Sequence, residues 1–240
     1  MTRLDDPTLV AREYADESRL RQRAAAFTGH ATGADARVPL VAAVAEVRPR
    51  RVLEVGCGWG DLAVWIARET RAEVVAVDLS PRMVELARAQ GVDASIADVQ
   101  DLPFADASFD VAVAAWMLYH VPGLDRGLAE LARILRPGGR LVAATNSRFH
   151  LMELRELVGS GPSTLSFARE NGEELLRPHF GRITREDVDS TMRFADRAEV
   201  DAYVRASIAM SPFVANLPSV VDEPFVARRA SSIFVAHTGA

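Results

Sequence analysis

Residues 51–60 read RVLEVGCGWG, so a short apolar run leads directly into three glycines at alternate positions. The apolar run is typical of a strand buried on both faces, and residues 61–69 have the periodicity of a helix. Glycines at a strand-to-helix turn carry no Cβ atoms, so a ligand can lie directly on the backbone there. The segment therefore predicts a strand–turn–helix unit with a ligand site at the turn, although a tight crossover can use the same glycines without a ligand.

Strand and helix patterns alternate from residue 51 to about residue 146. Nearly continuous apolar runs predict strands, whereas apolar residues at helical spacing predict helices. The predicted strands are 52–55, 73–77, 94–97, 109–115 and 140–145, and the predicted helices are 61–69, 81–90 and 124–135. Gly91 should end the second helix, and the turn Pro137-Gly138-Gly139 the third. This alternation indicates an α/β fold with a doubly wound parallel sheet.

The ends of the chain predict additional helices and two further strands. Helices are expected at 7–28, 35–47, 151–158, 172–179 and 197–209, and strands at 182–189 and 232–237. The chain then divides into four parts. They are an N-terminal helical lid (1–48), a nucleotide-binding core (49–146), a cap insertion that lines the substrate site (147–212) and a C-terminal part of the core (213–240).

Composition excludes several classes of protein. The 240-residue chain has a net charge of −5 and contains no lysine. An acidic chain gains little from counterion release, which argues against a nucleic-acid partner. Without lysine, neither a Schiff-base enzyme nor a P-loop NTPase can be built. The single Cys57 excludes an intrachain disulfide, and no Cys/His spacing suggests a metal site. No secretory signal or apolar run of ~20 residues is evident, so we expect a cytoplasmic protein without a membrane partner.

Acidic residues follow the second and third predicted strands. Asp78 comes twenty-two residues after Gly56, where a carboxylate can accept hydrogen bonds from both hydroxyls of a ribose. Asp98 and Val99 follow the third strand, where a carboxylate and a backbone N–H can recognise an adenine edge. The alternative for Asp78 is a solvated strand end or a cap for the helix at Pro81.

The glycine pattern distinguishes between two nucleotide cofactors. NAD sites use G-x-G-x-x-G, whereas this chain has G-x-G-x-G, with Asp61 at the position of the third NAD-site glycine. A carboxylate at the helix N-terminus repels a pyrophosphate, because both compete for the positive end of the helix dipole. A cationic sulfonium and ammonium tolerate acidic neighbours such as Glu54 and Asp61. Charge therefore favours S-adenosylmethionine over NAD.

Five segments in order carry a family resemblance. They are Val52 to Gly60, Val75 to Asp78, Asp98-Val99, LPFADASFDVAVAAWMLYHV and ILRPGGRLV. Together they resemble the class I (Rossmann-like) S-adenosylmethionine-dependent methyltransferases, in the ubiquinone-biosynthesis-like small-molecule branch. The resemblance covers about residues 50–145 and implies a seven-stranded sheet in the order 3-2-1-4-5-7-6, with strand 7 antiparallel. Strand 6 would lie near 182–189 and strand 7 near 232–237.

The resemblance also implies an activity and roles for individual residues. The activity is transfer of a methyl group from S-adenosylmethionine to an O, N or C atom of a small-molecule acceptor, leaving S-adenosylhomocysteine. Glu54, Gly56 and Gly58 would lie against the methionine portion, Asp78 and Leu79 against ribose and adenine, Asp98 and Val99 against adenine, and Ala115 and Trp116 beside the methyl group.

Tyr119 and His120 follow the fourth strand, on the side to which the methyl group should project. His120 can act as a general base toward the acceptor, with Tyr119 as a second catalytic candidate. The histidine can instead hydrogen-bond backbone, and Tyr14 and His150 are weaker candidates elsewhere. Arg148, Arg155 and Arg169 can bind an acidic acceptor or lie on solvated faces.

Two alternatives from other classes stay open at this point. One is an NAD-linked oxidoreductase, which the glycine pattern and the lack of a catalytic lysine disfavour. The other is a protein that binds S-adenosylmethionine without transferring a methyl group. The acceptor, the methylated atom, the need for a general base and the choice between monomer and homodimer are not fixed by the sequence.

Overall fold

The computed structural model describes residues 4–15, 17–18, 20–24 and 31–239. Its helices and strands alternate through the centre of the chain, as the apolar patterns predict. In chain order they are α1 (Pro7–Glu13), β1 (Ala31–Gly33), α3 (Arg37–Ala45), β2 (Arg51–Val55), α4 (Asp61–Thr70), β3 (Glu73–Asp78), α5 (Pro81–Ala89), β4 (Asp93–Ile96), β5 (Phe109–Ala115), η1 (Leu118–His120), α6 (Leu124–Ile134), β6 (Leu135–Asn146), α7 (Met152–Leu157), α8 (Gly172–Leu176), β7 (Ile183–Phe194), α9 (Arg197–Ala206), η2 (Ser211–Asn216) and β8 (Phe225–His237).

The described strands form an eight-stranded sheet in the order β1-β7-β8-β6-β5-β2-β3-β4. Strands β2 to β6 pair in parallel, and β8 runs antiparallel to both β6 and β7. Counted from β2 as strand 1, seven strands stand in the order 3-2-1-4-5-7-6 with strand 7 antiparallel, so the predicted fold class is confirmed. The sheet has one strand more than predicted, because the three residues of β1 pair antiparallel with β7.

The register of the parallel strands places the candidate residues at one edge. Val55 of β2 stands opposite Val77 of β3 and Ala114 of β5. The residues that follow these three positions therefore lie together at the carboxyl edge of the sheet, where ligands bind in open α/β folds. This edge brings the glycine turn, Asp78 and the segment after β5 into one neighbourhood.

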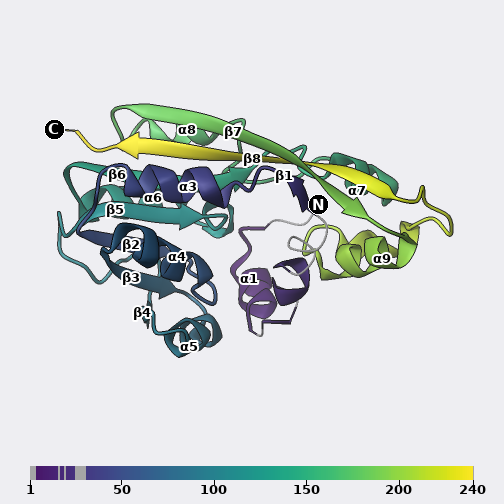
Figure 1. The fold of residues 1–240 in the computed structure, drawn as a ribbon, viewed down its shortest axis with the longest axis horizontal. Coiled ribbons are helices and arrows are strands. Elements are labelled where there is room, and N and C mark those ends of the chain that lie inside the picture. Colours follow the sequence, from purple (N-terminus) through teal and green to yellow (C-terminus); the bar gives the residue numbers. More distant parts are fainter. Residues whose placement is uncertain (1–3, 16, 19, 25–30, 240) are drawn as a thin grey trace.

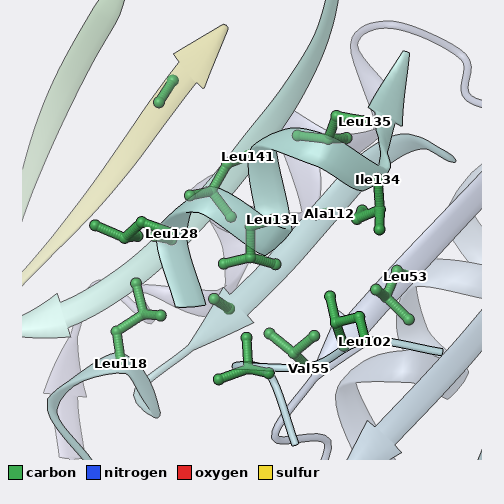
Figure 2. Close-up of a cluster of buried hydrophobic side chains, with 14 of the residues drawn as sticks. Leu53, Val55, Leu102, Ala112, Leu118, Leu128, Leu131, Ile134, Leu135 and Leu141 are labelled. Atoms are coloured by element: carbon green, nitrogen blue, oxygen red, sulfur yellow. The ribbon is translucent and has the colours of Figure 1, made fainter. Parts of the chain in front are cut away.

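Helices cover both faces of the sheet, and alternate strand residues supply each core. One face packs against α3, α4 and α5 through residues such as Val52 and Val113. The other face packs against α6 and α8, and Figure 2 shows Leu128 and Leu131 of α6 beside Leu141 of β6. Because successive strand side chains point to opposite faces, burial on both sides explains the nearly continuous apolar runs.

Strands β7 and β8 are longer than their sequence patterns predict. They pair from Ile183 opposite Ala236 to Phe194 opposite Phe225, and they extend past the parallel strands toward α7 and α9 (Figure 1). A separate apolar cluster forms there between α7, α9 and the two strands. The cap insertion and the main sheet are therefore continuous through these two strands.

Several predicted helices end earlier than expected, among them the helix expected at 172–179, which ends at Leu176. The helix expected at 7–28 stops at Glu13, because Tyr14 leaves the helical conformation with φ −104° and ψ 14°; residues 20–24 are helical again, and residues 16, 19 and 25–28 lie outside the described residues. The helix expected at 197–209 ends at Ala206. The third core helix ends at Ile134, because Leu135 pairs with Phe109 as part of β6, so the Pro137-Gly138-Gly139 turn lies within β6 rather than ending the helix.

Within the described part of the chain, the helices are too short or too polar to cross a bilayer.

Candidate functional site

The glycine-rich turn lies where β2 passes into α4. Gly56, Gly58 and Gly60 have φ angles of 65°, 53° and 93°, the region that favours glycine. A Cβ atom on Gly56 would lie 2.7 Å from Cβ of Met117, and one on Gly60 would lie 3.0 Å from Cβ of Ala87. The turn therefore needs glycine to pass beside the segment after β5 and to start α4 close against α5.

Glu54 lies in β2 beneath this turn and is 2% exposed. The backbone N–H of Ala63 donates to its carboxylate, while Oε2 has no hydrogen-bond partner among the described residues. Burial raises the pKa of Glu54 to about 8, with a further contribution from the negative charges of Asp78 and Asp61. A buried carboxylate oxygen without a donor is unfavourable. This position therefore suits a cationic or hydrogen-bond-donating group of a ligand.

Asp78 ends β3 with its carboxylate turned toward the glycine turn. Oδ2 accepts a hydrogen bond of 2.9 Å from the N–H of Gly58, and Oδ1 accepts one of 2.9 Å from the N–H of Ser80. Burial raises the pKa of Asp78, although these backbone donors oppose the shift. A carboxylate has about four acceptor sites, so part of it stays open to a ribose hydroxyl.

The predicted adenine-side residues follow β3 and β4. Leu79 is 57% exposed at the open edge, whereas Val99 is buried. Asp98 accepts hydrogen bonds from Gln100, at 2.9 Å from the backbone N–H and 3.1 Å from the side-chain amide. Gln100 in turn accepts a 2.9 Å hydrogen bond from the N–H of Gly123. Sequence reasoning missed Gln100, which engages the carboxylate proposed for adenine and ties its loop to the start of α6.

Trp116 directly follows Ala115, the last residue of β5, and has a φ of +55°. Such a backbone is uncommon for a large side chain and marks strain of about 1–3 kcal/mol. Its indole Nε1 donates to Oδ1 of Asn146 at 3.2 Å, and the Ser231 hydroxyl donates to the same oxygen at 2.8 Å. Residues of β6 and β8 thus hold the side chain predicted to flank the methyl group. No local pattern pointed to Asn146, because its partners are distant in the chain.

His120 contacts the N-terminal segment, residues 4–15, 17–18 and 20–24, with both ring nitrogens. Nδ1 lies 2.8 Å from the carbonyl oxygen of Leu4, and Nε2 lies 3.1 Å from the hydroxyl of Tyr14. A carbonyl only accepts, so Nδ1 carries the proton and Nε2 accepts from Tyr14. Burial lowers the pKa of His120 and raises that of Tyr14 to about 12. Tyr119 lies edge-on to the imidazole at 4.6 Å.

Arg23 connects this group to the cap. Its guanidinium donates to the carboxylate of Glu13 and, at 2.7 Å, to the carbonyl of Ala206 at the end of α9. Its positive charge also opposes the rise in the Tyr14 pKa caused by burial. The N-terminal segment is therefore attached both to the core and to α9, as its position between them in Figure 1 shows.

The N-terminal segment also lies over the glycine turn. The side chain of Leu20 is the nearest atom group to a Cβ placed on Gly58, at 3.9 Å. Ser80 donates to the carbonyl of Tyr14 at 2.7 Å. An open cavity of about 580 Å³ lies beside the turn, lined by Arg21, Ala24, Trp59, Asp61, Leu86, Ala89 and Gln90. The predicted cofactor residues are not among those that line it, and Gly58 and Ser80 lie under the N-terminal segment instead.

Comparison with known proteins finds a matching family and similar proteins. Residues 53–143 match the family described as the methyltransferase domain. The chain is 41% identical over 128 residues to the methyltransferase GfsG of Streptomyces halstedii, covering 50% of this chain and 46% of that protein. It is 38% identical over 119 residues to the ubiquinone biosynthesis O-methyltransferase of Xanthomonas oryzae pv. oryzae, covering 47% and 49%. The matched regions span about half the length of these curated relatives.

A solved structure shares the fold over the whole chain. The Haemonchus contortus phosphoethanolamine N-methyltransferase 2, in complex with phosphomonomethylethanolamine and S-adenosylhomocysteine, has a TM-score of 0.64 at 18% identity. The likeness covers 100% of this chain and 61% of that one. The fold is thus that of the Rossmann-like methyltransferases. Residues 53–143 thus match a methyltransferase domain, the chain is homologous to O-methyltransferases that include the ubiquinone enzyme, and the predicted resemblance is confirmed.

Proposed function

We propose that this chain binds S-adenosylmethionine at the carboxyl edge of the parallel strands and transfers its methyl group to an O, N or C atom of a small molecule. One observation carries the proposal. Oε2 of Glu54 is buried without a donor beneath a turn whose glycines leave the backbone bare. Asp78 and Asp61 place negative charge beside this oxygen, so the site fits an ammonium and a sulfonium and disfavours the pyrophosphate of NAD. The methyltransferase relatives support the same cofactor.

The binding roles follow the positions of the residues in the fold. Glu54, Gly56 and Gly58 would hold the methionine portion, and Asp78 with Leu79 the ribose and adenine. Asp98 and Val99 would lie against adenine, and Ala115 and Trp116 beside the methyl group. When bound, S-adenosylmethionine supplies an electrophilic methyl group on a sulfonium. The chain's own contribution is to align the acceptor and exclude water, which accounts for a large part of the rate of such displacements.

The acceptor would lie between the core, the N-terminal lid (1–48) and the cap (147–212). Its lone pair forms the new bond to the methyl carbon while the carbon–sulfur bond breaks, and the acceptor's proton leaves. Nε2 of His120 is a neutral acceptor at this place, already hydrogen-bonded to the Tyr14 hydroxyl. Tyr119, beside the imidazole, would shape the same space. We therefore assign proton removal to His120, with Tyr14 between it and the acceptor.

Calorimetry with S-adenosylhomocysteine and with NAD tests the cofactor. We expect S-adenosylhomocysteine to bind and NAD to bind weakly or not at all, and the reverse ranking would exclude the methyltransferase function. Release of S-adenosylhomocysteine from S-adenosylmethionine is then measured with a panel of hydroxyl, amine and carbon acceptors. Binding without turnover on any acceptor would favour a protein that binds the cofactor without transferring a methyl group.

A further inference from the structure

Three arginines of the cap are candidates for binding an acidic acceptor, and the structure separates them. Arg148 is exposed. Arg169 is fully engaged, donating to the carboxylate of Asp189 at 2.5 Å and to the hydroxyl of Ser232 at 2.8 Å. Arg155 alone of the three is both buried, at 9% exposed, and without a carboxylate partner among the described residues.

The Arg155 guanidinium has one hydrogen bond from Nε and two open terminal nitrogens. Nε donates to the carbonyl oxygen of His150 at 3.2 Å. The two terminal nitrogens donate to no group in the described part of the chain. An arginine stays protonated in proteins, so burial does not neutralise it. Its terminal nitrogens are not among the fully buried atoms that lack a partner, so they reach solvent and an anion can approach them.

The surroundings of Arg155 are neutral or positive. Tyr203 on α9 is 6% exposed, and its hydroxyl has no hydrogen-bond partner among the described residues. Burial raises the pKa of Tyr203, and the charges of Arg23, Arg155 and Arg229 oppose that shift. His150 is buried and uncharged, because burial lowers its pKa to about 3. The groups that face Arg155 therefore do not balance its charge.

Tyr203 links this position to the proposed reaction site. Tyr203 lies on α9, and the guanidinium of Arg23 donates to the carbonyl of Ala206 at the end of that helix at 2.7 Å. Tyr203 also packs in one apolar cluster with Leu154, the neighbour of Arg155 on α7. α9 therefore connects the N-terminal segment that contacts His120 with α7, the helix that carries Arg155.

We propose that Arg155 binds a carboxylate of the methyl acceptor, so that the acceptor is a small organic acid; this rests on the proposed function. The two open terminal nitrogens of a planar guanidinium form a fork that matches the two oxygens of a carboxylate. The carboxylate orients the acceptor with its reacting atom toward His120.

The test uses benzoate, benzamide and phenyl phosphate as probes, titrated calorimetrically with and without saturating S-adenosylhomocysteine. We expect benzoate to bind and the neutral isostere benzamide not to bind. Arg155→Met should weaken benzoate binding at least tenfold, whereas Arg148→Met, at an exposed arginine of the same insertion, should leave it unchanged. Arg155→Lys keeps the charge but loses the fork, so its affinity for benzoate should lie between those of the wild type and Arg155→Met. Without any anion, Arg155→Met should unfold at the same or a higher temperature than the wild type, because an uncompensated buried charge is removed.

Several results would overturn the proposal. They are equal benzoate affinity in the wild type and Arg155→Met, equal binding of benzamide and benzoate, no binding of benzoate, or tighter binding of phenyl phosphate than of benzoate. S-adenosylhomocysteine binding is read separately in the same samples. Its loss from the wild type would exclude the proposed function, whereas its retention with any of these four results would reject only the organic-acid acceptor. Retained S-adenosylhomocysteine binding also shows that each variant is folded.

Discussion

The hydroxyl of Tyr14 lies 3.1 Å from Nε2 of His120, across 106 residues of chain. The other ring nitrogen is fixed by the Leu4 carbonyl, so Nε2 is the one basic position of the imidazole. In this arrangement its lone pair is already used by Tyr14. An acceptor proton therefore reaches His120 either through the tyrosine oxygen or after the tyrosine moves away.

The first prediction is that Tyr14 relays the proton. The positive charge of Arg23 opposes the rise in the Tyr14 pKa, which favours a shared proton over displacement of the tyrosine. Tyr14→Phe and His120→Ala should each lower turnover about a hundredfold, the usual contribution of a positioned base. The double variant should be no slower than either, because the two residues act as one unit. S-adenosylhomocysteine affinity by calorimetry is the folding control. Additive losses in turnover would show that the two residues act separately.

The second prediction concerns the acid limb of the pH profile. Burial lowers the pKa of His120 below its ordinary value of 6.5, and only the neutral imidazole can take a proton. Turnover should therefore persist as the pH falls through 6.5 and decline only at lower pH. The profile of kcat is measured for the wild type and for His120→Ala, which should lack the limb. A wild-type decline centred above 6.5 would contradict this assignment.

The third prediction is that Glu54 makes the folded state less stable as the pH rises. Its pKa is about 8 in the fold against 4.5 ordinarily, so the folded chain holds a proton that the unfolded chain has released between these values. Folding stability from this group is therefore lost as the pH rises from 4.5 to 8, at about 1.4 kcal/mol per pKa unit. Glu54→Gln, which cannot ionise, should match the wild type in thermal midpoint at pH 5 and exceed it at pH 9. Midpoints that differ by the same amount at both pH values would disprove the shift.

The sequence predicted the elements whose pattern is local. Apolar runs such as Phe109–Ala115 are buried on both faces, so the run itself carries the information. β1 was not foreseen because three residues, two of them exposed, have no measurable periodicity. β7 was predicted to end at residue 189, since Ser190 and Thr191 interrupt the alternation of polar and apolar residues. Pairing with β8 holds the strand beyond that point. Pairing partners decide the ends of such strands.

The candidate site also contains residues that the sequence predicted and residues that it did not. The glycine turn and Asp78 follow strand ends in sequence, so their meeting at one edge could be predicted from the topology. Tyr14, Asn146 and Gln100 contact the candidate residues only through the tertiary fold. The Asn146 hydrogen bond to Ser231 joins residues 85 positions apart, and no spacing rule reaches that distance.

The fourth prediction is that Asp78 supports both the cofactor and the fold. Asp78→Ala should lower S-adenosylhomocysteine affinity about ten- to a hundredfold, corresponding to about 1.5–3 kcal/mol for hydrogen bonds to a charged group. It should also lower the thermal midpoint, because the N–H groups of Gly58 and Ser80 lose their acceptor. Asp93→Ala, at an exposed carboxylate at the start of β4, is the control and should change neither quantity. An unchanged affinity in folded Asp78→Ala would remove Asp78 from the cofactor site.

The last prediction is that the N-terminal segment opens to admit the cofactor. Arg82 at the start of α5 binds the Glu17 carboxylate at 2.9 Å through two nitrogens, which holds the segment over the turn beside Ser80. Exposed ion pairs of this kind contribute about 0–1 kcal/mol, so the anchor is weak enough to release. Trypsin cuts this lysine-free chain after arginine, and we expect S-adenosylhomocysteine to slow cleavage at Arg12 and Arg21.

Arg82→Ala should speed that cleavage without ligand and should raise both the association and the dissociation rate of S-adenosylhomocysteine. The affinity should change by less than about fivefold, because the free-energy difference is that of one surface pair. Fluorescence of Trp59, over which Arg21 lies at 5.6 Å, reports the binding rates. Arg177→Ala, which removes the ion pair with Glu173 on α8, is the matched control and should change neither rate. If cleavage at Arg12 is equally fast with and without ligand, the segment is not a lid, and the cofactor must reach Gly58 by another path.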